Sequence, residues 1–203
     1  MSAQPPLNLG VLVSGTGSNL QAILDAIAAG TLHANVRVVI SNKPDAKALE
    51  RARNASVPAL CIPYKEFPSR EAFDRALIAA LRDAQVDWVV LAGFMRLLTP
   101  EFLQAFPGRV INIHPSLLPA FPGVEATKQA LAYGVKVTGC TVHFVDQGVD
   151  SGKIIAQRAV AVEASDDLAT LAARIHAAEH ELFVGVLCDI AAGRVVPLQA
   201  VAE

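Results

Sequence analysis

Cysteine is scarce in this 203-residue sequence. The three cysteines, Cys61, Cys140 and Cys188, are an odd number, lie far apart and form no C-x-x-C pair. The sequence therefore indicates no disulfide framework, and each cysteine is predicted to be a small buried residue in a reducing cytoplasm. No Cys/His cluster has the spacing of metal ligands either, so no metal is expected.

Signals for a membrane, for secretion and for nucleic acid are missing as well. Although 53% of the residues are hydrophobic, no apolar run free of polar interruption is long enough to span a bilayer. Residues 1–9 lack the basic start and the apolar core of a signal peptide. The net charge is −2 and the sequence has no basic run, so no cluster of positive charge indicates binding to nucleic acid or to an anionic membrane. We expect a cytoplasmic protein whose partners are small molecules.

The sequence instead alternates short apolar runs with segments of helical periodicity. Five strands are predicted, at residues 9–13, 36–40, 59–62, 86–91 and 109–113. A helix is expected after each of the first four. Two more strands, at 138–145 and 153–158, would form a hairpin before a final helix over residues 168–192. This order predicts an α/β fold with a single Rossmann-like domain over residues 1–203. Its sheet would be mostly parallel, with an antiparallel hairpin near the C-terminal half and helices on both faces.

A glycine-rich turn at residues 14–19 follows the first strand and precedes a helix. Such a turn aims backbone N–H groups and the positive end of the helix at one point, which suits a phosphate. The dinucleotide fingerprint requires glycine where Leu20 stands, and no Walker lysine follows, so a lone phosphate monoester is favoured over NAD or ATP. The alternative is a tight turn that binds nothing, since glycine favours such turns for backbone reasons alone.

A polar pair marks the end of the fifth strand. Asn112 and His114, two residues apart, would leave the strand on the same side, and Pro115 keeps His114 extended. In an open α/β sheet, ligands bind at this end of the strands. The alternative is a structural pair whose hydrogen bonds are satisfied within the protein.

Two other features leave alternatives open. Arg96 is the only charged residue between Asp87 and Glu101, so it requires a structural partner, solvent or a ligand. The Leu118-Pro119 bond, in a proline-rich loop, is a candidate cis peptide.

The motifs together resemble a known family. Asn-x-His-Pro-Ser-Leu-Leu-Pro at residues 112–119, with Asp-x-Gly at 150–152, is similar to the folate-dependent formyltransferases. Gly-x-Gly-Ser-Asn at 15–19 narrows the resemblance to the glycinamide ribonucleotide formyltransferases, and it extends over essentially the whole chain. The resemblance implies an enzyme that moves the formyl group of 10-formyltetrahydrofolate to the amine of glycinamide ribonucleotide in de novo purine biosynthesis. It implies no metal, and either a monomer or a homodimer.

Residue roles are carried over from the same resemblance. Asn112, His114 and Asp150 match the catalytic triad, in which Asn112 and a protonated His114 would donate to the formyl oxygen while Asp150 favours the imidazolium. The residues implied for the ribonucleotide are Gly15, Thr16, Gly17, Ser18, Asn19, His176, Ala177, Ala178 and Glu179. The residues implied for folate are Arg70, Met95, Arg96, Leu97, Leu98, Asn112, Asp146, Gln147, Gly148, Val149 and Asp150. Residues 1–110 would form the phosphate-binding half and residues 111–203 the catalytic and folate-binding half.

Three other classes share part of this pattern. Methionyl-tRNA formyltransferase carries a further C-terminal domain, for which 203 residues leave no room. Formyltetrahydrofolate hydrolase carries an N-terminal regulatory domain, whereas the first strand here is expected near Leu9. A non-catalytic nucleotide-binding module would have no reason to bring Asn112, His114 and Asp150 together. We therefore expect these three side chains to converge on one cleft, with the glycine turn at its other end.

Overall fold

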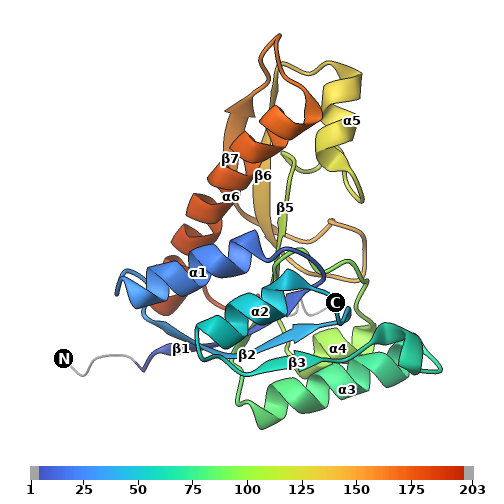
Figure 1. Ribbon diagram of the computed structural model, residues 1–203, viewed down its shortest axis with the longest axis vertical. Coiled ribbons are helices and arrows are strands. Elements are labelled where there is room, and N and C mark those ends of the chain that lie inside the picture. The colour runs from blue at the N-terminus through green and yellow to red at the C-terminus, as the bar shows by residue number, and fades with distance from the viewer. Residues whose placement is uncertain (1–4, 199–203) are drawn as a thin grey trace.

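One seven-stranded sheet organises the chain (Figure 1). The computed structural model describes residues 5–198, so both ends of the predicted domain, residues 1–4 and 199–203, lie outside the described residues. Across the sheet the strand order is β3-β2-β1-β4-β5-β6-β7. The strands are β1 (Leu7–Val13), β2 (Ala34–Ser41), β3 (Ala59–Cys61), β4 (Trp88–Leu91), β5 (Val110–His114), β6 (Val137–Phe144) and β7 (Ile154–Ala161).

The first five strands pair in parallel, and β6 runs antiparallel to both of its neighbours. The predicted α/β class, with a mostly parallel sheet and an antiparallel hairpin, is therefore confirmed. Strand residues are buried on both faces: Val11 and Val90 belong to one apolar cluster, Leu12 and Val89 to the other. Burial of both faces explains why these strands are continuous apolar runs in the sequence.

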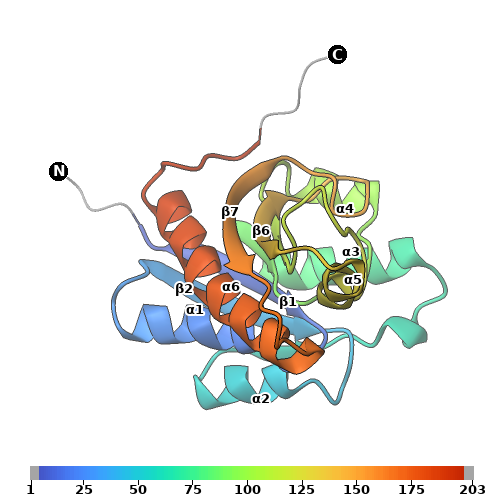
Figure 2. The same ribbon diagram turned by 90° about the horizontal axis from the view of Figure 1, so that it is seen from above.

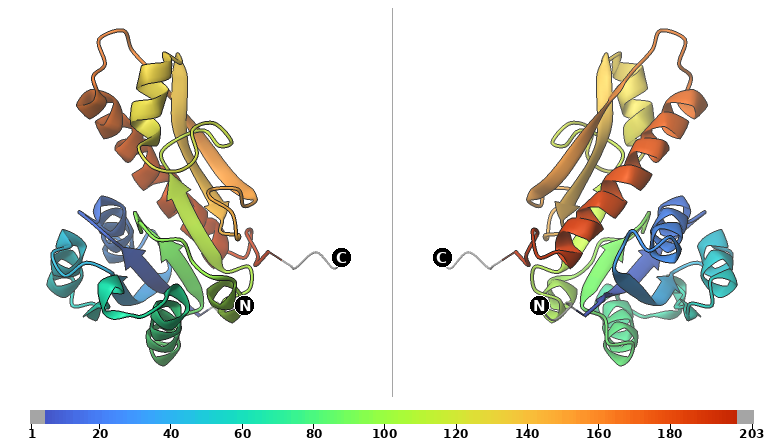
Figure 3. Two further views of the ribbon diagram at one scale, coloured as in Figure 1. Left: turned by 90° about the vertical axis from the view of Figure 1, so that its right-hand side faces the viewer. Right: turned by 90° about the vertical axis from the view of Figure 1, so that its left-hand side faces the viewer.

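Helices cover both faces of the sheet, as expected (Figures 2 and 3). Helices α1, α2 and α6 contribute to the cluster around Val11, whereas α3 and α4 contribute to the cluster around Leu12. The helices are α1 (Ser18–Ala28), α2 (Lys47–Asn54), α3 (Arg70–Asp83), α4 (Pro100–Ala105), α5 (Ala126–Tyr133) and α6 (Leu168–Ala191), with a short 3-10 helix at Tyr64–Glu66. No helix within residues 5–198 is long and apolar enough to cross a membrane.

The prediction for the cysteines is wrong at one position. Cys140 is buried and Cys188 is partly buried, but Cys61 is exposed. Cys61 ends β3, a three-residue strand at the edge of the sheet, beside which no further strand of residues 5–198 lies. The Leu118-Pro119 peptide is cis, as expected.

Candidate active site

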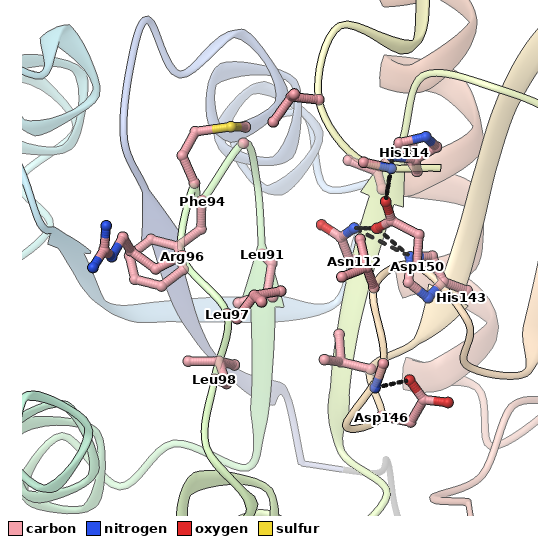
Figure 4. A pocket seen from close by; sticks show the side chains of 18 of the residues that line it. Leu91, Phe94, Arg96, Leu97, Leu98, Asn112, His114, His143, Asp146 and Asp150 are labelled. Atoms are coloured by element: carbon pink, nitrogen blue, oxygen red, sulfur yellow. Dashed lines mark hydrogen bonds and ion pairs between the residues drawn. The ribbon is translucent and has the colours of Figure 1, made fainter. Parts of the chain in front are cut away.

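A cleft of about 560 Å³ opens at the carboxyl ends of β4 and β5 (Figure 4). One wall is the segment that follows β4, residues 93–98. The other wall is the end of β5, together with residues 123–125 and the loop between β6 and β7. The first wall presents mostly apolar side chains. The second carries several polar ones, of which four form a cluster: Asn112, His114, His143 and Asp150. An apolar wall facing a few convergent polar groups is typical of a small-molecule site.

The three predicted catalytic side chains converge in this cleft. His114 Nδ1 lies 3.2 Å from Asp150 Oδ2, and Asn112 Nδ2 lies 3.4 Å from Asp150 Oδ1. His114 is only 4% exposed, and its Nε2 lies 2.8 Å from the carbonyl oxygen of Phe121. Both ring nitrogens of His114 thus face acceptors, an arrangement that an imidazolium satisfies with two donated hydrogen bonds.

His143 is a fourth member of the cluster that the sequence did not reveal. It lies opposite Asn112 in the antiparallel pairing of β5 and β6, and its Nε2 is 3.1 Å from Asn112 Nδ2. Its Nδ1 lies 2.8 Å from the Phe144 carbonyl oxygen, to which it donates, and its Nε2 also lies 3.7 Å from Asp150 Oδ1. The ring therefore fixes the Asn112 carboxamide beside the carboxylate.

Asp150 is held in place by its backbone and by donors from three elements. Its φ of 52° lies in the left-handed region, which aspartate tolerates better than most residues. Burial opposes ionisation of Asp150. Hydrogen bonds from His143 and from the Gly123 N–H, with the charges of His114 and His143, outweigh it and hold its pKa below the ordinary value. The carboxylate is therefore ionised at neutral pH.

The expected folate residues fall into two groups. Most of them line the cleft: Met95, Arg96, Leu97, Leu98, Asn112 and all five loop residues from Asp146 to Asp150. The guanidinium of Arg96 instead points away from the triad in Figure 4 and stacks on the Tyr64 ring, 3.2 Å from its centroid. Of the alternatives for Arg96, the structure thus provides a structural partner. Arg70 is not a lining residue and reaches the wall only through the Leu97 carbonyl oxygen, at 3.4 Å.

The glycine turn lies beside this cleft rather than within its lining. It follows β1, the neighbour of β4, and Ser14 Oγ accepts from the backbone N–H of Met95 at 2.9 Å. On its other side, Asn19 Nδ2 donates to Glu179 Oε2 of α6 at 3.1 Å. Asn19 Oδ1 is buried and has no hydrogen-bond partner. A buried acceptor without a partner is expected where a ligand supplies the missing donor.

The other residues expected to contact the ribonucleotide are spread along one turn of α6. Glu179 and Ala178 are buried, whereas His176 and Ala177 are exposed. The contact between Glu179 and Asn19 brings this turn next to the glycine turn. No group of three or more His, Cys, Asp or Glu side chains within residues 5–198 is arranged to hold a metal ion.

Glu179 is expected to make stability depend on pH. Burial raises its pKa from 4.5 to about 7, although the Asn19 hydrogen bond lowers it. Between these values the unfolded chain releases a proton that the folded protein keeps. The free energy of unfolding should therefore fall across this window, by about 3 kcal/mol. Urea unfolding at both ends of the window should show the fall in wild type and not in Glu179→Gln. Glu181→Gln, at an exposed carboxyl of the same helix, is the matched control, and a fall that persists in Glu179→Gln would contradict the assignment.

Gly17 is required by the backbone and by packing. Its φ is +73°, and a Cβ there would lie 2.6 Å from the Ala48 Cβ of α2. Gly17→Ala is expected to lower the free energy of unfolding by about 3 kcal/mol, from left-handed strain and overpacking together. Gly15→Ala is the control, because no atom lies within 4 Å of its added Cβ. Equal losses in the two variants, measured by urea unfolding, would refute the packing argument.

Known proteins resemble this chain over nearly its whole length. A family model described as formyl transferase matches residues 7–187. The trifunctional purine biosynthetic protein adenosine-3 of Drosophila melanogaster is 50% identical over 195 residues, which are 95% of this chain but 14% of that protein. The phosphoribosylglycinamide formyltransferase of Bacillus subtilis (strain 168) is 44% identical, with 87% of this chain and 91% of the relative covered.

A solved structure also resembles this chain over nearly its whole length. Glycinamide ribonucleotide transformylase 1 from Symbiobacterium toebii superposes with a TM-score of 0.93 at 51% identity. The superposition covers 97% of this chain and 95% of that one. Nearly the whole of this chain, its sheet included, therefore has a structural counterpart in that protein.

Proposed function

The chain belongs to the formyl transferase family, in its phosphoribosylglycinamide formyltransferase group, and we propose how its cleft transfers the formyl group. Enzymes of this group act on small molecules in de novo purine biosynthesis. The donor would be 10-formyltetrahydrofolate and the acceptor the amine of glycinamide ribonucleotide, giving formylglycinamide ribonucleotide and tetrahydrofolate. The observation that supports these roles best is the convergence of Asn112, His114 and Asp150 in one cleft.

Two nitrogen donors would stabilise the charge that develops on the formyl oxygen. When the amine attacks the formyl carbon, the C=O electron pair moves onto oxygen, and donors already aimed at that oxygen lower the barrier. His114 offers Nδ1, because its Nε2 is held by the Phe121 carbonyl. Asn112 offers Nδ2. In the cleft both nitrogens face the Asp150 carboxylate, which thereby keeps the two donors side by side before substrate arrives.

Proton transfer completes the reaction. The attacking amine must lose a proton, and the folate nitrogen must gain one as its bond to the formyl carbon breaks. A water between the amine and Asp150 would carry the first proton to the carboxylate, and His114 Nδ1–H would give the second to the folate nitrogen. The proton on Asp150 can then return to His114, whose Nδ1 lies 3.2 Å away, and both groups regain their starting states.

The two substrates would approach from different elements. The apolar wall of Leu91, Phe94, Leu97 and Leu98 suits the flat face of the folate ring system, and polar groups of residues 145–150 would fix its orientation. The phosphate of the ribonucleotide would bind the backbone N–H groups at the start of α1. A sugar hydroxyl is a suitable donor for the unpartnered Asn19 Oδ1.

A turnover assay with alternative acceptors tests this function. Tetrahydrofolate should form from 10-formyltetrahydrofolate when glycinamide ribonucleotide is present, and mass spectrometry should detect one formylated ribonucleotide for each tetrahydrofolate. Water alone should give no comparable turnover. Equal release of formate with and without the ribonucleotide would instead identify a hydrolase.

A further inference from the structure

Arg51 of α2 forms hydrogen bonds with the glycine turn and with α1. Its Nε donates to the carbonyl oxygen of Thr16 at 2.8 Å, and its Nη1 donates to Gln21 Oε1 of α1 at 3.0 Å. Gln21 is fixed in turn, because its Nε2 donates to Asp25 Oδ1 at 2.8 Å. One planar guanidinium therefore connects α2, the turn and α1, and its rigid fork fixes the direction of both hydrogen bonds.

A second contact from α2 acts on the preceding residue of the turn. The backbone N–H of Ala48 donates to the carbonyl oxygen of Gly15 at 3.1 Å. Two consecutive carbonyl groups, those of Gly15 and Thr16, thus face α2. Gly17 also lies so close to Ala48 that no side chain fits between them.

The orientation of these carbonyls fixes the orientation of the amides. In a trans peptide the N–H points opposite to the C=O of the same peptide unit. With the Gly15 and Thr16 carbonyls facing α2, the N–H groups of Thr16 and Gly17 point away from it. Gly17, whose φ is +73°, continues this curve into the N-terminus of α1, which has no side-chain cap. Successive N–H groups that point to one side form an anion-binding nest.

Arg51 forms these hydrogen bonds rather than an ion pair. None of the ion pairs formed within residues 5–198 includes it. Its hydrogen bonds go to two neutral oxygen atoms, the Thr16 carbonyl oxygen of the turn and Gln21 Oε1 of the helix that follows it. The cation is thus used to orient backbone rather than to neutralise a carboxylate.

We propose that Arg51 is a positioning residue for phosphate binding, which holds the turn at residues 15–17 with its amides directed at the phosphate of the acceptor. It acts through the Thr16 carbonyl and does not contact the substrate. This inference rests on the proposed function only for the identity of the phosphate-bearing ligand.

The test compares Arg51→Met, Arg51→Lys and Arg53→Met. Arg51→Met should raise the KM for glycinamide ribonucleotide about tenfold, with kcat and the KM for folate within about twofold of wild type. Arg51→Lys should raise that KM nearly as much, because lysine keeps the charge but lacks the fork that holds Thr16 and Gln21 together. Arg53→Met, which removes an exposed charge from the same helix, should behave as wild type.

A direct binding measurement separates this inference from the proposed function. Titration with ribose 5-phosphate should shift the backbone amide resonances of Thr16 and Gly17 in wild type, and about tenfold more ligand should be needed in Arg51→Lys. Wild-type KM in Arg51→Lys would show that charge alone matters and would overturn the positioning role. An equal change in kcat and in the KM for folate in Arg51→Met would overturn it too. Failure of wild type to turn over, with ribose 5-phosphate still bound at the turn, would count against the proposed function alone.

Discussion

Replacing His114 with alanine is expected to lower kcat for formyl transfer by about 10³-fold, the size of effect expected when a group acts as both oxyanion donor and general acid. Folate binding should survive, because the apolar wall of residues 93–98 lies on the opposite side of the cleft from His114. The measurements are kcat with both substrates saturating and the Kd for tetrahydrofolate from fluorescence titration. A Kd within about threefold of wild type would place the loss in the chemical step.

Two controls make this result decisive. Added imidazole should restore part of the activity of His114→Ala, since the removed ring is buried and leaves a space of its own shape. The thermal midpoint of the variant should show that the fold persists, although the Phe121 carbonyl and Asp150 each lose a donor. Turnover within tenfold of wild type would exclude His114 as the principal donor.

Replacing Asp150 with asparagine is expected to lower kcat by about 10²-fold to 10³-fold while preserving shape. The variant keeps an acceptor for the Gly123 N–H but loses the charge that faces His114 and the base that accepts the amine proton. The pKa of Asp150 lies below its ordinary value, so the wild-type carboxylate is ionised throughout the neutral range. The loss should therefore be present both at about pH 6 and at about pH 8. Steady-state rates at both pH values provide the measurement.

Asp150→Glu distinguishes charge from position. It restores a carboxylate but displaces it by one methylene, at a residue whose left-handed backbone is less favourable for glutamate. We expect activity between those of wild type and Asp150→Asn. If Asp150→Asn keeps near-wild-type kcat, or loses activity only at high pH, then Asp150 is not the proton acceptor.

Much of the architecture was predictable because strand and helix periodicities are strong here. The continuous apolar runs around Val11 and Val90 indicate buried parallel strands in a sheet that is covered on both sides. The family was identified from the motif at residues 112–119. Cys61 could not be placed, because nothing in the sequence shows that β3 is three residues long and lies at the edge. Its exposure depends on which strands neighbour it, and that is a property of the whole sheet.

The site was predictable where it depends on a motif and not where it depends on register. His143 lies opposite Asn112 only because β6 pairs with β5 in one particular antiparallel alignment, which a shift of one residue would change. Arg96 was recognised as needing a partner, but Tyr64 comes from a distant segment and an aromatic partner has no sequence signature. The role of Arg51 could not be predicted for a similar reason, because its hydrogen-bond acceptor is a backbone carbonyl group, which every residue possesses.

The packing of α6 has a consequence for how the chain folds during its synthesis. Phe183, Val186 and Leu187, late in the chain, cover the same apolar cluster as Val11 of the first strand. β1 is also paired on both sides only after β4, which comes later in the chain, has been synthesised. Until α6 has emerged from the ribosome, the nascent chain therefore exposes one apolar face of its central strands. Such a surface is prone to aggregation and to binding by chaperones.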